Sequence, residues 1–423
     1  MKGGIFRQCR KKMNLYIFNE ICLGTVYGIG TYIRELSILL KNSAINVCVV
    51  NLWSDKPQIR IEEVDGIKHW FFPVPIQGQN KIDQQKLLEL YYHNVMYLIQ
   101  LHIKESEELI FHFNFNQKGR IAEELKKTFE CKVITTIHYF NWCFSLFGNV
   151  SRLKKILLFE GNYQQSELGQ KINESYRTEK TLFELSDQII CLSEDTQQIL
   201  QFDYQIKPEK IKVIYNGLKD RNLISDRHIL LQKYHLSDIH FFIFVGRLEE
   251  LKGLSYALRA FKTVLNKNPD CHFFIVGEGD FRAFMKECED IWMKVTWTGR
   301  INQEKLYDLY SIADIGILPS LTEQCNYVAI EMMMHGLPMI TSACSGLREM
   351  VEDGITGFQV PVIEYEESVD IDTDLLAEKM LFLLQHPDER QRMGANARKR
   401  YEKVYSADIF RQNMLDFYHS LYE

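Results

Sequence analysis

The chain has 423 residues, of which 46% are hydrophobic and 25% are charged, and its formal net charge is −6. This length suggests two or three domains, and the small negative charge excludes a general attraction to nucleic acid or to an anionic membrane. The ten cysteines stand mostly in apolar segments and form no CxxC pattern or Cys/His ladder. We therefore expect a cytoplasmic protein with no disulfide framework and no nucleic-acid partner.

The first half of the chain alternates short apolar runs with helical patterns. Residues 1–12 are basic and lack the apolar stretch of a signal peptide, so we expect either a disordered extension there or a true start at Met13. Beyond them, runs such as NLYIFNE, INVCVVNL and KVITTIH predict strands, and TYIRELSILLKN, with apolar residues three and four apart, predicts a helix. Strands this apolar are buried on both faces, which indicates a parallel sheet covered by helices. Residues 13–216 are therefore predicted to form a Rossmann-like domain.

The second half repeats this alternation more regularly. A polar, irregular stretch over 217–240 is predicted to connect two domains. After it, FFIFVG, CHFFIVG, VTWTG and IGILPS alternate with helical patterns, so residues 241–400 are predicted to form a second Rossmann-like domain. Residues 401–423 are expected to form a helix that packs back on the first domain. The predicted fold class is α/β, with two doubly wound domains facing each other across a cleft.

Charged side chains follow two of the predicted strands in the second domain. Arg247 and Lys252 come after FFIFVG, and Glu323 comes after IGILPS, just ahead of a helix that begins near Asn326. Ligands of such folds bind beyond the carboxyl ends of the strands, and a helix start favours an anion. Two cations beside a helix start would neutralise a diphosphate, whereas the carboxylates of Glu323 and Glu331 suit the hydroxyls of a sugar and a ribose. The pattern indicates a sugar-nucleotide site.

These motifs resemble those of the retaining nucleotide-sugar glycosyltransferases of family 4, which have the GT-B fold. The resemblance covers GRLEELKG, VGEGD, WTGR, the two glutamates with the trailing GLPMI, and EMVEDGITGFQV. It implies that the two cations bind the donor diphosphate, that Glu331 holds the ribose, and that Glu323 contacts the donor sugar. It also implies that the backbone around Arg300 and Ile301 lines the nucleobase. The implied donor-binding residues are Gly30, Arg247, Lys252, Arg300, Ile301, Glu323, Gln324, Cys325, Asn326 and Glu331.

The first half resembles the same family more loosely. VYGIGTYIREL, which contains Gly30, corresponds to the family's glycine-rich loop, and TTIHYF corresponds to the strand whose terminal histidine, His138, faces the donor sugar. The family often has an aromatic residue and a glycine where this chain has Cys325 and Asn326, which leaves the donor open between UDP- and GDP-linked sugars. Asn is a good N-cap, so the helix start is still expected. The implied catalytic residues are His138, Arg247, Lys252 and Glu323.

The resemblance also implies transfer with retention of configuration, without a metal and without a cofactor beyond the nucleotide sugar. Fixed cations and helix N–H groups stabilise the leaving diphosphate, which removes the need for a metal. The run VDIDTDLL lacks the glycine and the distal glutamate of a calcium loop. We expect Asp372 or Asp374 to cap the following helix instead. Cys325 is expected to have a packing or backbone-contact role rather than to be a reactive thiol.

The acceptor is expected to enter from the first domain, and its nature is left open. The first choice is a lipid-linked saccharide or polysaccharide, and the alternative is a peptide or small molecule. The run SRLKKILLF over 151–159 is consistent with peripheral contact with a membrane, and equally with an ordinary half-buried helix. Rival functions are a GT-B sugar-nucleotide epimerase, a glycogen-type phosphorylase and a non-catalytic sugar-nucleotide-binding protein. The predicted acceptor-lining residues are Tyr27, His112, Asn114, Phe140 and Trp142.

Overall fold

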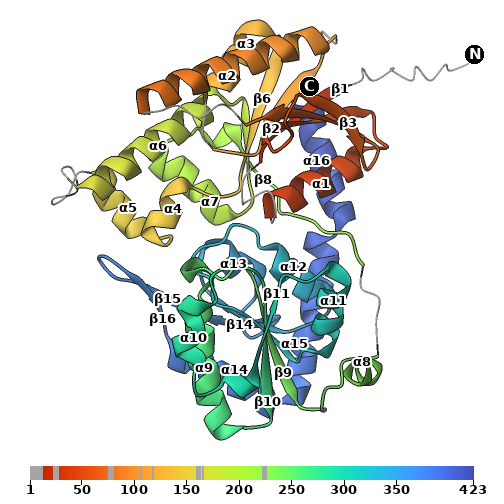
Figure 1. Cartoon of the computed structure of the whole chain (residues 1–423), viewed down its shortest axis with the longest axis vertical. Helices are drawn as coiled ribbons and strands as arrows, with labels where there is room; N and C mark the ends of the chain where they lie inside the picture. The colour runs from red at the N-terminus through yellow and green to blue at the C-terminus, as the bar shows by residue number, and fades with distance from the viewer. Residues whose placement is uncertain are drawn as a thin grey trace, which may run out of the picture.

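The computed structural model of the chain has two α/β domains stacked along its long axis (Figure 1). The structure describes residues 13–21, 28–74, 81–104, 107–116, 119–158, 163, 166–221 and 226–423. The predicted extension over 1–12 therefore lies outside the described residues.

The first domain is built on an eight-stranded sheet with the order β3-β4-β2-β1-β5-β6-β7-β8. Every pairing in it is parallel except that of β3 with β4 at one edge. The strands are β1 (Met13–Glu20), β2 (Ile45–Ser54), β3 (Arg60–Val64), β4 (Ile67–Pro73), β5 (Leu109–Phe113), β6 (Cys131–Ile137), β7 (Gln188–Cys191) and β8 (Ile211–Val213). The helices are α1 (Gly28–Leu40), α2 (Lys81–His102), α3 (Gly119–Thr128), α4 (Asn141–Leu146), α5 (Val150–Leu157), α6 (Glu167–Leu185) and α7 (Glu194–Gln198), with the short helices η2 (Ile199–Asp203) and η3 (Pro208–Lys210).

The second domain is built on a parallel six-stranded sheet with the order β11-β10-β9-β12-β13-β14. Its strands are β9 (His240–Val245), β10 (Cys271–Val276), β11 (Val295–Gly299), β12 (Ile315–Leu318), β13 (Met339–Ser342) and β14 (Gly357–Val360), with a separate antiparallel hairpin of β15 (Val362–Glu364) and β16 (Val369–Ile371). Its helices are η4 (Glu250–Lys252), α9 (Leu254–Lys267), α10 (Arg282–Cys288), η5 (Trp292–Lys294), α11 (Gln303–Ile312), α12 (Tyr327–Met334), α13 (Ser345–Met350), α14 (Thr373–Gln385), α15 (Pro387–Arg400) and η6 (Tyr401–Tyr405).

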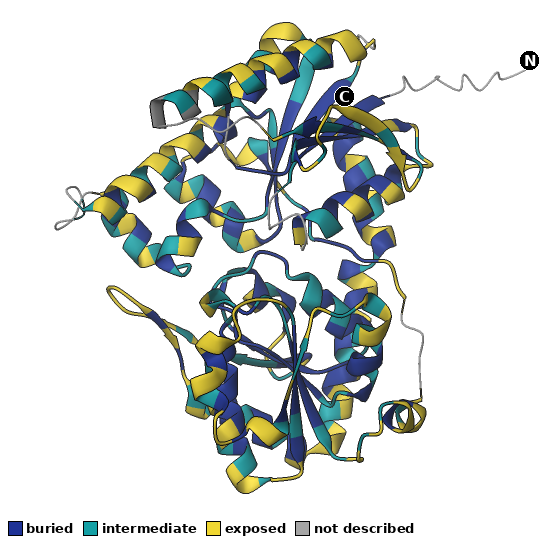
Figure 2. Ribbon diagram, viewed as in Figure 1, coloured by how far each residue is buried: buried dark blue, intermediate teal, exposed yellow. Residues whose placement is uncertain are grey.

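The central strands of both sheets are buried on both faces (Figure 2). All five residues of β5 and all four of β12 are buried, because helices cover each side of the sheets. The start of α14 bears out the expected helix cap, since the Asp372 carboxylate accepts hydrogen bonds from the backbone N–H groups of Asp374 (3.0 Å) and Leu375 (2.9 Å). The spaced aspartates therefore form a helix start.

The connection between the domains is less irregular than its sequence indicates. It contains helix α8 (Arg227–Lys233), which Asp226 caps by accepting from the backbone N–H of His228 at 2.7 Å. Asp308 of α11 holds the end of α8, because its carboxylate lies 2.7 Å from both Lys233 Nζ and the Tyr234 hydroxyl. The second half of the connection thus packs on the second domain.

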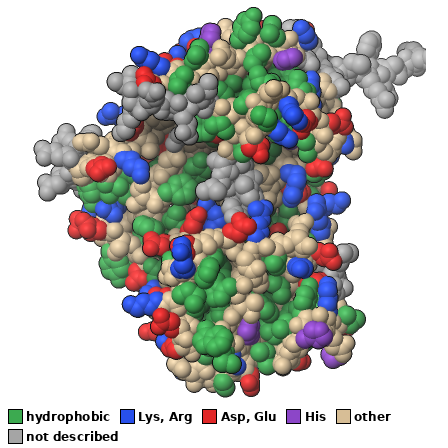
Figure 3. Space-filling view, in the orientation of Figure 1, with side chains coloured by type: hydrophobic (Ala, Val, Ile, Leu, Met, Phe, Trp, Pro, Cys, Tyr) green, Lys and Arg blue, Asp and Glu red, His purple; other side chains and the backbone are tan. Residues whose placement is uncertain are grey.

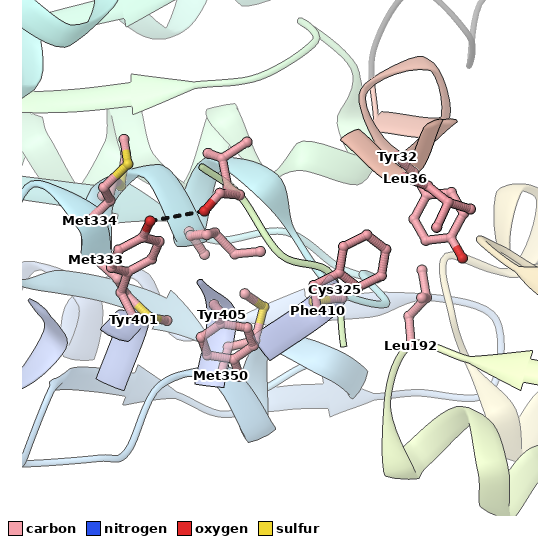
Figure 4. Packing of buried hydrophobic residues seen from close by; sticks show 14 of the residues in the cluster. Tyr32, Leu36, Leu192, Cys325, Met333, Met334, Met350, Tyr401, Tyr405 and Phe410 are labelled. Atoms are coloured by element: carbon pink, nitrogen blue, oxygen red, sulfur yellow. Dashed lines mark hydrogen bonds between the residues drawn. The ribbon is translucent and has the colours of Figure 1, made fainter. Parts of the chain in front are cut away.

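The last helix, α16 (Ala407–Ser420), lies beside α1 of the first domain (Figure 1). Arg411 Nε donates to the Leu39 carbonyl at 3.0 Å, and the Tyr422 hydroxyl donates to the Leu109 carbonyl at 2.8 Å. Figure 4 shows a hydrophobic cluster that joins the two domains here, with Tyr32 of α1 beside Phe410 of α16. The chain therefore crosses back to the first domain at its end.

A buried histidine ties α16 to the first sheet. His112 is fully buried in β5, with its Nδ1 2.7 Å from the Tyr418 hydroxyl and its Nε2 2.6 Å from Thr136 Oγ1. Burial lowers the pKa of His112 to about 3, so the ring is neutral and one nitrogen donates while the other accepts. Both nitrogens are used in holding the structure together.

We expect Tyr418→Phe to lower the free energy of unfolding by about 1–3 kcal/mol, because it leaves a buried imidazole nitrogen without a partner. Tyr422→Phe is the matched control. It removes one hydroxyl from the same chain end, but Tyr422 is 38% exposed, so water can replace the lost bond. Urea unfolding of both variants measures the difference. Equal stability of Tyr418→Phe and the wild type would contradict the assignment.

Candidate active site

A cleft of about 600 Å³ lies between the two domains and is lined by both. Figure 3 shows basic and acidic side chains along this boundary on the face drawn. The first domain contributes Gly28, Ile29, His138, Tyr139, Asn141, Cys143, Phe144, Leu192 and Asn216. The second contributes Phe244, Val245, Gly246, Arg247, Leu251, Lys252, Ser320, Thr322, Glu323, Gln324, Cys325, Asn326, Tyr327 and Val328.

The predicted cations reach the cleft from the turn between β9 and α9. Arg247 Nη1 lies 2.8 Å from Glu249 Oε1, and Lys252 Nζ lies 2.5 Å from Glu323 Oε1. The side chains of Lys252 and Glu323 are only 20% and 12% exposed. Gly253 brings this turn against the end of β12, because a Cβ at its φ of 70° would lie 1.9 Å from the Pro319 carbonyl oxygen. Arg247, Lys252 and Glu323 therefore meet at one wall of the cleft.

Helix α12 begins at the same wall. Asn326 is its N-cap, and its side-chain oxygen accepts from the backbone N–H of Ala329 at 3.0 Å. The Cys325 carbonyl accepts from Asn216 Nδ2 at 2.7 Å, and burial raises the pKa of the Cys325 thiol to about 12. The thiol is therefore protonated at neutral pH. Gln324 is buried, and its side-chain oxygen accepts from Ser193 of the first domain at 3.2 Å.

Four of the predicted donor residues do not line this cleft. Gly30 lies in the first turn of α1, two residues beyond Gly28, and the partly buried Ile301 packs against the core. Arg300 is exposed and follows β11, next to a second hollow of about 550 Å³ at the ends of β10 and β11. Glu331 lies one turn further along α12 than the cleft-lining residues.

Glu331 sits in a low-dielectric position although part of its side chain is exposed. Its Oε2 accepts a hydrogen bond from the Tyr310 hydroxyl at 3.0 Å. Burial raises its pKa to about 7, an effect that the Tyr310 bond and the nearby charge of Arg34 only partly offset. A carboxyl with this pKa changes charge near neutral pH, so the affinity for any ligand that it binds depends on pH.

His138 lines the same cleft from the first domain. It follows β6, its Nε2 lies 3.0 Å from Asn114 Oδ1, and its ring meets that of Tyr32 edge-on at 4.8 Å. Burial lowers the pKa of His138 to about 3, so the imidazole is neutral at physiological pH. Asn114 is buried and is hydrogen-bonded to His138, but it does not line the cleft itself.

The prediction of the acceptor residues was wrong at four positions, because His112, Asn114, Phe140 and Trp142 do not line the cleft. His112 is the buried histidine of β5 described above. Phe140 and Trp142 are 0% and 1% exposed and stack on each other at 5.8 Å in the core of the first domain. Large aromatic side chains gain free energy by burial, and the turn after β6 directs these two inward. Tyr27 lies outside the described residues.

Sequence reasoning missed four residues of the same segment that do line the cleft: Tyr139, Asn141, Cys143 and Phe144. A signal for two of them exists, because α4 begins at Asn141 and positions three apart share one helix face. Phe144 is 46% exposed, and its ring meets that of Tyr139 edge-on at 5.3 Å. The aromatic lining is therefore present, but it is built from different side chains.

Comparison with known proteins decides the family. The model of Glycosyltransferase Family 4 matches residues 26–221, and the model of Glycosyl transferases group 1 matches residues 232–400. The chain belongs to the group 1, family 4-like glycosyltransferases. An uncharacterized glycosyltransferase of Methanocaldococcus jannaschii is 31% identical over 184 residues, which cover 41% of this chain and 47% of that protein. The chain matches about half the length of several such curated relatives.

Solved structures show the same fold. Sucrose-phosphate synthase from Thermosynechococcus elongatus has a TM-score of 0.74 at 20% identity, covering 97% of this chain and 99% of that one. The Anabaena protein HepE, in complex with UDP and glucose, has a TM-score of 0.72 at 14% identity, covering 96% of this chain and 100% of that one. The two facing Rossmann-like domains of this glycosyltransferase-family chain thus form the GT-B fold.

Two acidic side chains of the second domain cap helices of the first. Glu349 accepts from the backbone N–H groups of Glu194 (2.8 Å) and Asp195 (2.7 Å) at the start of α7. Glu364, on the β15–β16 hairpin, accepts from those of Val150 (3.3 Å) and Ser151 (3.4 Å) at the start of α5. Carboxylates are stabilised at helix N-termini, so these contacts hold the two domains together across the cleft.

The basic, apolar run over 151–159 falls on α5 (Val150–Leu157). Residue 159 lies outside the described residues. Leu153 and Ile156 are buried, as in an ordinary half-buried helix. The hairpin also engages its cations, since Arg152 Nη1 donates to the Glu367 carbonyl at 2.9 Å and Lys155 Nζ lies 3.5 Å from Glu366. Membrane contact through this helix stays a prediction.

Within the described part of the chain, no three His, Cys, Asp or Glu side chains form a group that could hold a metal ion. No helix described there has the length and apolar character that crossing a membrane would require.

Proposed function

We propose that this protein transfers a hexosyl group from a UDP- or GDP-linked sugar to a saccharide or lipid-linked acceptor, with retention of configuration, in glycan biosynthesis. The observation that carries the proposal is the wall of the cleft where Arg247, Lys252, Glu323 and the start of α12 meet. Support also comes from HepE, which has the same fold and was solved with UDP and glucose. A peptide or small-molecule acceptor is the alternative.

The charges at this wall match the parts of a sugar nucleotide in order. Arg247 and Lys252 would bind the diphosphate together with the N–H groups at the start of α12. Lys252 Nζ is only 2.5 Å from Glu323 Oε1. Glu323 would therefore lie next to the diphosphate that Lys252 binds, in reach of the donor sugar. The hollow beside Arg300 gives room for the nucleobase at the other end.

Bond breaking places negative charge on the departing diphosphate. Arg247 and Lys252, already fixed in the cleft, would stabilise that charge more in the transition state than in the ground state. The ion pair with Lys252 makes Glu323 a weak nucleophile. We therefore propose attack by the acceptor hydroxyl on the face that the phosphate leaves. The anomeric carbon loses its bond to the phosphate oxygen, gains one to the acceptor oxygen, and the acceptor's proton passes to the leaving phosphate.

We expect transfer to persist in excess EDTA, because protein cations rather than a metal neutralise the leaving group. Added magnesium should change the rate by no more than about twofold, through its binding to free nucleotide. The measurement is initial rate against EDTA and divalent-ion concentration. Abolition by EDTA with rescue by manganese would show instead that a metal bridges the donor to the protein.

The function is tested by incubating the protein with a panel of UDP- and GDP-linked sugars, with and without candidate acceptors. The proposal expects release of nucleoside diphosphate that depends on a saccharide or lipid-linked acceptor, with the product anomer matching the donor. An isomerised sugar nucleotide would favour the epimerase, phosphate-dependent breakdown of a glucan would favour the phosphorylase, and binding without turnover would favour a non-catalytic protein. Transfer to a peptide or small molecule alone would select the alternative acceptor.

The proposal includes a cytoplasmic location, at or near the inner face of the membrane if the acceptor is lipid-linked. Retention of the protein on vesicles that carry the acceptor lipid, compared with neutral vesicles, would test that contact.

A further inference from the structure

A buried carboxylate lies beneath the loop that carries His138 to the cleft. Glu179 of α6 is 0% exposed, does not line the cleft itself, and is hydrogen-bonded to Asn141, which does. Its Oε1 accepts from the backbone N–H of Asn141 at 2.7 Å and from the side-chain Nδ2 of the same residue at 2.8 Å. Its Oε2 accepts from the hydroxyl of Tyr204, which is also fully buried.

Buried polar groups form hydrogen bonds with three residues of the loop over 138–141. His138 is bound to Asn114, the Tyr139 carbonyl accepts from Asn116 Nδ2, and Asn141 is bound to Glu179. Asn114 and Asn116 follow the end of β5, and Glu179 lies within α6. A buried ionisable group is costly unless such bonds compensate it, and burial accordingly raises the pKa of Glu179 to about 7. The contacts fix the loop's position relative to the cations across the cleft.

The carboxylate also decides which way the Asn141 amide points. An amide whose oxygen faced Glu179 would set two acceptors against each other, so Nδ2 must face it. Because the oxygen and the nitrogen of an amide diverge from the same planar carbon, Oδ1 is then directed away from Glu179, and Asn141 lines the cleft. An amide that is free to turn would offer either end to a ligand, whereas this one offers an acceptor.

We propose that Glu179 is a positioning residue that holds Asn141 Oδ1 as a hydrogen-bond acceptor for a hydroxyl of the acceptor substrate. This inference rests on the proposed function. Among the described residues that line the cleft from the first domain, none carries a formal charge, since its histidine is neutral. Beside Asn141 lie the rings of Tyr139 and Phe144. The substrate end recognised here is thus an uncharged, hydroxyl-bearing group with an apolar face, such as a neutral sugar ring.

The first test is Asn141→Ala, which leaves Glu179 bound to Tyr204 and to the backbone N–H of residue 141. We expect kcat/KM for the acceptor to fall about tenfold, the size of one lost hydrogen bond, with the affinity for nucleoside diphosphate unchanged within about twofold. Glu179→Ala should cause at least the same loss for the acceptor. If Glu179→Ala does not fold, Asn141→Ala alone decides.

The second test exchanges the two groups. Asn141→Asp alone places two carboxylates together and should lower kcat/KM for the acceptor about 100-fold. Adding Glu179→Gln restores an amide–carboxylate pair with the donor reversed and keeps an acceptor oxygen toward the cleft, so we expect it to recover at least tenfold of that loss. A merely structural role would lower stability and nucleotide affinity together with acceptor kinetics.

Three outcomes would overturn the inference: acceptor kinetics of Asn141→Ala equal to the wild type, equal losses for nucleotide and acceptor, or no recovery in the exchanged double variant. These are distinct from failure of the proposed function, which would show as absence of acceptor-dependent turnover by the wild-type protein with every nucleotide sugar. That result would overturn both.

Discussion

Replacement of Arg247 or Lys252 by alanine is expected to lower sugar transfer at least about 100-fold. Both side chains line the cleft, and Lys252 Nζ lies 2.5 Å from Glu323. Each variant removes a fixed positive charge from the place where the leaving diphosphate develops its negative charge. Removal of one such preorganised group from other active sites lowers kcat by at least about 100-fold. Most of the loss should be in kcat, because the charge is needed most in the transition state. Steady-state kinetics with varied donor measure it.

Lys252 needs a second variant, because alanine also leaves Glu323 without its partner in a place where only 12% of that side chain is exposed. Lys252→Met keeps the alkyl chain and removes the charge. The matched control is Lys262→Ala on α9, a lysine that pairs with Asp290 at the surface and lies outside the cleft lining. Wild-type turnover in the Arg247 and Lys252 variants, or an equal loss in the Lys262 variant, would remove the diphosphate assignment.

Replacement of the two glutamates is expected to separate the nucleotide from the sugar. Glu331→Gln should weaken binding of both the nucleoside diphosphate and the intact donor, because glutamine loses the charge-assisted bonds to the ribose, about 1–3 kcal/mol in total. Glu323→Gln should leave the affinity for nucleoside diphosphate almost unchanged while impairing transfer. Calorimetric titration of both variants with diphosphate and with donor tests this. An equal loss of diphosphate affinity would mean that the carboxylates act as one network.

The raised pKa of Glu331 adds a pH dependence to that prediction. Burial raises this pKa from the usual 4.5 to about 7, so the folded protein holds the proton more tightly than the unfolded chain does. The corresponding stability is present below pH 4.5 and is lost as the pH rises toward 7. Ribose hydroxyls donate to the ionised form, so nucleotide affinity should rise between pH 6 and pH 8. Glu331→Gln, in which only the nucleotide titrates, is the control, and an identical pH profile in that variant would contradict the assignment.

The elements of the second domain could be predicted from sequence because local rules govern them. Parallel strands end at one edge of a sheet, which is why Arg247 and Glu323 could be placed together from apolar runs alone. Asparagine and aspartate favour N-caps for local reasons, and Asn326 and Asp372 do cap their helices. The side-chain contact between Lys252 and Glu323 was beyond such rules, because it depends on how closely the β9–α9 turn approaches β12.

The cleft-lining residues of the first domain could not be predicted from local rules. Whether an aromatic residue after β6 faces the core or the cleft depends on the turn that follows, and that turn buries Phe140 and Trp142 while exposing Phe144. Glu179 stands 38 residues from Asn141 in the chain, so their hydrogen bond leaves no mark on local sequence. Helix α8 was missed because its few residues lie within a polar stretch. Long-range packing decides each of these positions.

The central claim is that a nucleoside diphosphate binds where β9, β12 and α12 converge. A crystal structure of the protein with a bound nucleoside diphosphate tests it most directly. The account predicts phosphate oxygens within about 3 Å of the Arg247 guanidinium and Lys252 Nζ, beside the backbone N–H groups at the start of α12. A diphosphate bound elsewhere, with Arg247 still held by Glu249 and Lys252 still held by Glu323, would contradict it.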